Sequence, residues 1–149
     1  MGCTRSQIDA ALQELYDRIP DIPGCTGECW RSCGPIDMSI RERQRLRTAG
    51  YKITPGIRAL QKGPGNFWCE ALTADGRCGA YSIRPLVCRL WGAVEGMRCP
   101  FGCQPVGGWL SDDEANDLIL AAYEIGGGMP VGPAAEAWNA YAAAQRSGG

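Results

Sequence analysis

The stretch "CEALTADGRCGAYSIRPLVCRLWG", residues 69–92, carries Cys69, Cys78 and Cys88 at wide and nearly equal intervals. The whole chain of 149 residues contains nine cysteines and no histidine. One or two cysteines in a protein are often buried as small apolar residues. Nine are too many for that role, and several of the cysteines in this chain stand beside Gly and Pro in turn-like sequence. An odd number of cysteines also leaves at least one thiol unpaired in any scheme made only of disulfides. The thiols therefore indicate a site that binds metal.

Length and composition bound the class of protein. A chain of 149 residues predicts one domain with a modest core. The formal net charge of −1 gives no general attraction to nucleic acid or to an anionic membrane. The N-terminal segment lacks the basic and apolar parts of a secretory signal, so we expect a cytoplasmic protein, in which structural disulfides are rare.

Helix caps and periodicity predict an α-rich fold, small α+β at most, with helices framing an irregular cysteine-rich metal-binding centre. A Ser or Thr followed three residues later by Gln or Glu is a capping box, and the sequence has this pattern at Thr4–Gln7, Ser39–Glu42 and Ser111–Glu114. Pro20 and Gly50 are expected to end the first two helices, and Pro85 to begin a short one.

Extended structure is expected only on either side of the "TADG" turn, as short strands over residues 67–72 and 78–83. Residues 1–125 are predicted to form a single metal-binding domain. Residues 126–149 are predicted to form a Gly-rich linker, a short C-terminal helix and a frayed tail.

Every cysteine except Cys3 is a candidate metal ligand: Cys25, Cys29, Cys33, Cys69, Cys78, Cys88, Cys99 and Cys103. Sites made only of thiolates suit zinc or an iron–sulfur cluster. Structural zinc usually uses C-x2-C pairs, which are absent, whereas C-x3-C spacing with scattered partners favours one or two clusters of the 4Fe-4S type. Zinc is the alternative. The sequence leaves open whether the ligands serve two sites or one site with spare thiols.

Residues beside the cysteines have two possible roles. Arg84 and Arg89 are candidate cofactor-binding residues, because guanidinium groups near the sulfurs would offset negative charge and raise a reduction potential. Five aromatic residues within three positions of a cysteine would either keep water from a cluster or belong to the core: Trp30, Phe67, Trp68, Trp91 and Phe101.

The segments "CTGECWRSC", residues 25–33, and "CEAL…GRCGAYSIRPLVCRLW" resemble the cysteine-cluster family of zinc- or iron-chelating domains. The second segment matches the family pattern at these positions: Cys69 and Leu72, Cys78 and Tyr81, Arg84-Pro85, and Cys88-Arg89. The first segment departs from it, with longer spacings and no adjacent Cys-Cys pair. The resemblance implies metal chelation by an iron–sulfur cluster. The family includes a domain of bacterial flagellin lysine N-methylase, so it also implies an enzymatic alternative.

We expect a small iron–sulfur protein that acts as a redox, electron-transfer or cluster-sensing accessory through a protein partner. The alternatives are a cluster-dependent protein-modifying enzyme resembling a lysine methyltransferase, and a structural zinc module. No catalytic residue is predicted, because the sequence has no Ser-His or Cys-His pair and no evident carboxylate dyad. A helix with arginines at every second position from Arg41 to Arg47 could meet nucleic acid, but a solvated face is favoured. No membrane partner is expected.

Overall fold

The computed structural model describes residues 2–25, 36–53, 68–128, 140 and 143–144, and this part of the chain is rich in helix and has no sheet. Its elements are α1 (Arg5–Asp17), α2 (Ile40–Thr48), the 3-10 helix η2 (Tyr81–Ile83), α4 (Leu86–Leu90), the 3-10 helix η3 (Glu95–Met97) and α5 (Asp112–Gly126). The α-rich fold class is confirmed. The predicted C-terminal helix lies almost wholly outside the described residues.

Three of the helices begin at the predicted capping boxes. In α1 the Thr4 hydroxyl accepts a hydrogen bond from the Gln7 N–H at 3.1 Å, and the Gln7 side chain accepts one from the Thr4 N–H at 2.8 Å. The same reciprocal pattern opens α2 and α5. Gly50 follows the end of α2 with a φ of 99°, a left-handed conformation that favours glycine. α1 ends at Asp17, ahead of Pro20.

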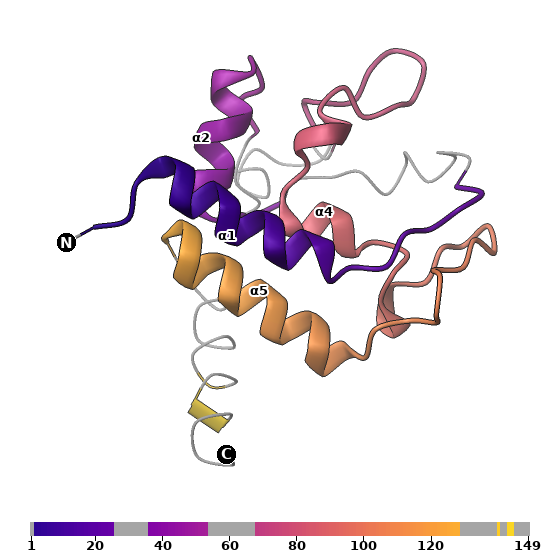
Figure 1. Cartoon of the computed structure of the whole chain (residues 1–149). Helices are drawn as coiled ribbons and strands as arrows, with labels where there is room; N and C mark the ends of the chain where they lie inside the picture. Colours follow the sequence, from indigo (N-terminus) through magenta and orange to yellow (C-terminus); the bar gives the residue numbers. More distant parts are fainter. Residues whose placement is uncertain (1, 26–35, 54–67, 129–139, 141–142, 145–149) are drawn as a thin grey trace.

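The main core lies between α1, α4 and α5. α1 and α5 run side by side in opposite directions, and α4 packs against both (Figure 1). Their facing sides bury a continuous apolar cluster: Leu12, Leu15, Tyr16, Leu86, Leu90, Val94, Ala115, Leu118 and Ala122. These residues recur at intervals of three and four along α1 and α5, as expected for one buried face of a helix. Within the described ranges, no helix is both long and apolar enough to cross a membrane.

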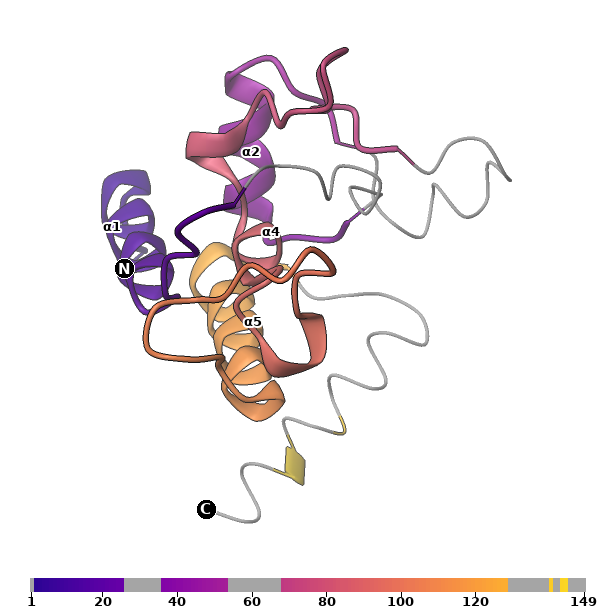
Figure 2. The ribbon, with the colours of Figure 1, turned by 90° about the vertical axis from the view of Figure 1, so that its right-hand side faces the viewer.

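A second, smaller core surrounds α2, which stands at the end of the α1–α5 pair (Figure 2). It is formed by Met38, Leu46, Ile53, Ala71 and Ala80. Cys69 and Cys78 are partly buried and pack against this cluster. Two of the predicted ligands are therefore placed by the apolar contacts of α2.

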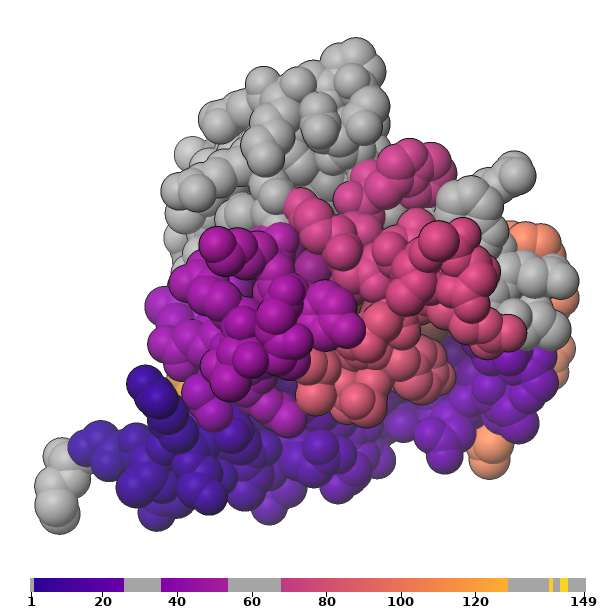
Figure 3. All heavy atoms as spheres, turned by 90° about the horizontal axis from the view of Figure 1, so that it is seen from above, coloured from indigo at the N-terminus to yellow at the C-terminus, as the bar shows by residue number. Residues whose placement is uncertain are grey.

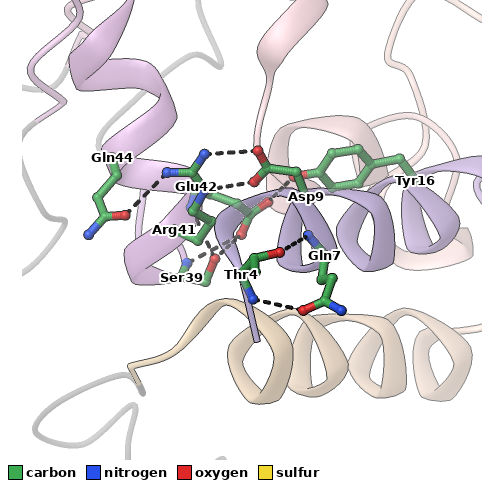
Figure 4. A network of polar contacts seen from close by, with 8 residues as sticks. All are labelled: Thr4, Gln7, Asp9, Tyr16, Ser39, Arg41, Glu42 and Gln44. Atoms are coloured by element: carbon green, nitrogen blue, oxygen red, sulfur yellow. Dashed lines mark hydrogen bonds and ion pairs between the residues drawn. The ribbon is translucent and has the colours of Figure 1, made fainter. Parts of the chain in front are cut away.

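The buried carboxylate of Glu42 joins α1, α2 and α4. Figure 4 shows its contacts with Tyr16 and Ser39. It accepts hydrogen bonds from the Tyr16 hydroxyl at 2.7 Å, the Leu86 N–H at 2.6 Å and the Ser39 hydroxyl at 2.8 Å. Burial, followed by the adjacent Glu42 carboxylate, raises the pKa of Tyr16. Because Leu86 is the first residue of α4, this network fixes where α4 begins.

The end of α5 lies directly against the start of α2. A Cβ atom added to Gly126 would lie 2.2 Å from the Ser39 hydroxyl oxygen, so only glycine permits this approach. The Ile40 N–H donates to the Gly127 carbonyl at 3.0 Å. These contacts fix the start of α2 against the end of α5.

The prediction of two short strands over residues 67–72 and 78–83 is wrong. The chain does reverse at Gly76, and Leu72 and Cys78 form an antiparallel bridge, but the pairing stops there. The Tyr51 hydroxyl donates a hydrogen bond to the Gly79 carbonyl at 2.9 Å, and the residues that follow form η2. A side chain from outside the hairpin thus uses the backbone group that a longer ladder would need.

Candidate metal centre

The loop "CPFGC", residues 99–103, brings backbone N–H groups near the thiol of Cys99. Burial acts to raise the pKa of the Cys99 thiol, but the N–H groups of Phe101, Cys103 and Gly102 and the Cys103 thiol outweigh it and hold the pKa below its ordinary value. Donors directed at a sulfur stabilise the thiolate, which is the form that binds metal. The loop therefore prepares Cys99 to act as a ligand.

The segment that follows α1 lies beside this loop. The Cys103 thiol donates to the Gly24 carbonyl at 3.4 Å, and the Val106 N–H donates to the Asp21 carbonyl at 2.8 Å. Cys25 is exposed and is the next residue after Gly24. Two parts of the chain that are far apart in sequence thus bring their cysteines into one neighbourhood.

Cys69 and Cys78 form a second pair on either side of the hairpin turn. Cys78 is fixed by its bridge to Leu72, whose own N–H donates to the Cys69 carbonyl at 3.1 Å. Burial raises the pKa of the Cys69 thiol, with Cys78 and Glu70 adding to this, although the Ala71 N–H is directed at the sulfur and acts in the opposite sense. An apolar wall on one side and an N–H donor on the other are the surroundings that shield and tune a metal-bound thiolate.

Cys88 lies on α4, whose position is fixed by the main core. Leu86 and Leu90 are 1% and 0% exposed and face α1 and α5. Because successive residues of a helix are about 100° apart, Cys88 lies on the opposite side, away from that core. It is partly exposed there.

Arg84 and Arg89 build the turn that leads into α4. Arg89 Nε donates to the Arg84 carbonyl at 2.7 Å, and its guanidinium lies 4.0 Å from the centre of the Tyr16 ring. Arg84 Nε donates to the Tyr81 carbonyl at 3.0 Å and lies over the Tyr81 ring at 3.8 Å. The Tyr-x-x-Arg-Pro motif thus has a structural role in directing the chain toward Cys88. A role for either arginine in holding a cofactor stays a prediction.

The aromatic residues beside the cysteines are not part of the core where the structure describes them. Trp68, Trp91 and Phe101 are 50%, 37% and 55% exposed. Trp30 and Phe67 lie outside the described residues. Of the two roles left open for these aromatic residues, membership of the core does not hold for the three described ones.

The structure thus brings together two cysteine pairs from the predicted ligand set, and it places Cys25 close to one of them. Among residues 2–25, 36–53 and 68–128, no three Cys, Asp or Glu side chains are close enough to hold a metal ion, and no disulfide is formed. Cys29 and Cys33 lie outside these ranges. The full set of eight ligands stays a prediction.

Sequence reasoning missed two structural residues of this region. Glu42 was expected only as part of a capping box, and no local pattern pairs it with Tyr16 or with the start of α4. The Gly24 carbonyl accepts a hydrogen bond from Cys103, and a contact made by a backbone group cannot be read from the residue type. Its neighbour Cys25 was the nearest available indication.

The donors present fit a metal bound through thiolates. The chain offers no imidazole. Within the described residues the thiols are not consumed by disulfides, and N–H groups are directed at the sulfurs of Cys69 and Cys99. Zinc and iron–sulfur clusters are the metal groups that such donors suit.

Comparison with models of protein families matches residues 24–115 to the CxxCxxCC family, described as a "putative zinc- or iron-chelating domain". The match covers more than half of the chain, and the protein belongs to this family. It is therefore a cysteine-rich module of the zinc- or iron-chelating class. The matched range contains every predicted ligand from Cys25 to Cys103. No curated protein and no solved structure matches the chain.

Proposed function

We propose that the protein binds an iron–sulfur cluster and serves as a redox, electron-transfer or cluster-sensing accessory to a protein partner. The observation that supports this most strongly is the contact of Cys103 in the loop 99–103 with the segment that carries Cys25, beside a Cys99 thiol whose pKa the N–H groups of the loop lower. Hydrogen bonds to sulfur are among the features that set the reduction potential of such clusters.

Cys99, Cys103 and Cys25 would hold the cluster on one side, and Cys69, Cys78 and Cys88 are further candidate ligands among the described residues. When bound, an iron–sulfur cluster supplies one-electron oxidation and reduction. The chain's own contribution is to orient the thiols and to limit access of water. The loop orients Cys99 through its N–H groups, and the apolar cluster around Leu46 covers one side of Cys69 and Cys78.

The test is a redox titration of protein purified without oxygen. We expect visible absorption that dithionite bleaches and that returns on reoxidation. A colourless protein with stoichiometric zinc would contradict the cluster. The same sample is then tested for binding of S-adenosylmethionine and for methyl transfer to protein lysines. Tight binding with turnover would replace the accessory role by an enzymatic one.

A further inference from the structure

A recess of about 260 Å³ opens beside α2, and none of the described residues that line it is a cysteine. Its wall is formed by Arg41, Arg45, Thr48, Ala49 and Ile83. The side chains of α2 lie against those of the segment after residue 68 on this face of the molecule (Figure 3). The recess is thus built by two segments that the fold holds together, at a place separate from the cysteine pairs.

Arg41 is held in position by an acidic residue of α1 (Figure 4). Its guanidinium donates to both carboxylate oxygens of Asp9, at 2.6 and 2.8 Å. The hydrogen bond from Arg41 is the largest influence on Asp9 and keeps the pKa of its carboxyl below the ordinary value. At this edge of the recess, the negative charge of Asp9 is therefore balanced by the positive charge of Arg41.

Arg45 lines the same recess, where Asp9 is near enough to interact with its charge but is already hydrogen-bonded to Arg41. Within the described part of the chain, its guanidinium makes no hydrogen bond and no ion pair. Arg84 and Arg89 stand nearby and bind carbonyl groups and aromatic rings, which leaves their positive charges in place. Burial lowers the pKa of Arg89, and the charges of Arg84 and Arg45 lower it further, while Tyr16 and Glu42 act in the opposite sense. The recess therefore has an excess of positive charge.

We propose that this recess binds a carboxylate side chain from an acidic segment of a protein partner, with Arg45 as the residue that pairs with it. The planar guanidinium matches a carboxylate through two parallel hydrogen bonds. Ile83 and Ala49 give apolar contact for the aliphatic part of a glutamate. The inference goes beyond the proposed function and does not depend on a cluster.

A carboxylate fits this recess better than a phosphate group. Protein sites for phosphate commonly supply backbone N–H groups, often from the start of a helix. Thr48 and Ala49 are at the end of α2, where the backbone presents carbonyl groups. Those carbonyls repel a dianion more strongly than a monoanion.

The experiment measures binding of a short, fluorescently labelled, glutamate-rich peptide by anisotropy at low salt. We expect Arg45→Gln to weaken binding about tenfold, which corresponds to about 1.4 kcal/mol. Arg47→Gln is the matched control, because Arg47 lies on the same helix, is exposed and does not line the recess. It should change binding little. Thermal unfolding and metal content are measured on the same samples, so that loss of fold or metal is not mistaken for loss of the recess.

Three results would overturn the proposal. The first is absence of peptide binding to the unmodified protein. The second is an equal loss in Arg45→Gln and Arg47→Gln, which would mean diffuse attraction to surface charge. The third is displacement of the peptide by inorganic phosphate or duplex DNA at lower concentrations than by free glutamate-rich peptide.

Discussion

Glu42 is 3% exposed, and its carboxylate is enclosed by donors from three helices. Removing a carboxylate from water costs several kcal/mol unless protein donors replace the lost hydration. The Tyr16 hydroxyl, the Ser39 hydroxyl and the Leu86 N–H provide that replacement. A charged residue is therefore stable inside this apolar interior, and it fixes the start of α4 in the process.

Replacing Glu42 by Gln should destabilise the fold by about 3 kcal/mol. The amide N–H₂ of Gln is itself a donor, so it cannot accept the hydrogen bonds that one carboxylate oxygen now accepts, and the donors facing it lose their partner. Urea unfolding followed by circular dichroism measures the change. Glu114→Gln is the matched control, because Glu114 has the same capping-box position in α5 but is exposed. Its cost should stay below about 1 kcal/mol. Equal losses in the two variants would show that Glu42 acts only as a cap.

At the scale of elements, α1 and α2 are joined near the surface by Asp9 and Arg41. The two side chains are 32% and 15% exposed, and their closest atoms are 2.6 Å apart. A partly exposed pair of this kind contributes about 1 kcal/mol at most. Its more specific signature is a dependence on pH, because Asp9 titrates at a lower pH in the folded protein than in the unfolded chain.

Asp9→Asn should remove that pH dependence. The ordinary pKa of an unfolded Asp is about 3.9. Since the pKa of Asp9 is lowered by folding, its contribution is fully present above that value and is lost as the pH falls through the folded pKa. The stability difference between the unmodified protein and Asp9→Asn should therefore be largest near neutral pH and shrink in acid. Unfolding curves at a series of pH values measure it.

Glu95→Gln is the control for this experiment. The Glu95 side chain is 65% exposed, and its contact with Arg98 is longer, at 3.6 Å. At neutral pH we expect Glu95→Gln to destabilise the fold less than Asp9→Asn does, because this pair is more exposed. A deficit in Asp9→Asn that stays constant or grows in acid would contradict the assigned role of Asp9.

The elements that could be predicted are those whose sequence signals lie within a few residues of each other. The capping boxes at Thr4, Ser39 and Ser111 are local patterns, and all three are confirmed. The strand prediction failed where Tyr51, a distant residue, donates to the Gly79 carbonyl and the chain closes into η2. Contacts such as that of Cys103 with Gly24 join residues 79 positions apart, and no periodicity reveals them.

At the scale of the whole molecule, the helices form a frame on which the cysteine segments are placed. The first pair is in the loop before α5, close to the segment that leaves α1. The second pair lies in the hairpin that packs on α2, and Cys88 is on α4. The predicted ligands could be chosen from residue type and spacing alone. The approach of the segment that carries Cys25 to the loop 99–103 could not be predicted, because it depends on how the chain packs over a separation of 79 residues.

The measurement that tests the central claim most directly is the amount of iron, zinc and acid-labile sulfide per chain in protein purified without oxygen. We expect iron and sulfide together in the unmodified protein. Cys99→Ser should lower both and reduce stability, because assembly of a metal site contributes to folding. Cys3→Ser, which alters the one cysteine outside the predicted ligand set, should change neither. Stoichiometric zinc without sulfide, or a preparation without metal whose thiols are paired in disulfides, would contradict the account.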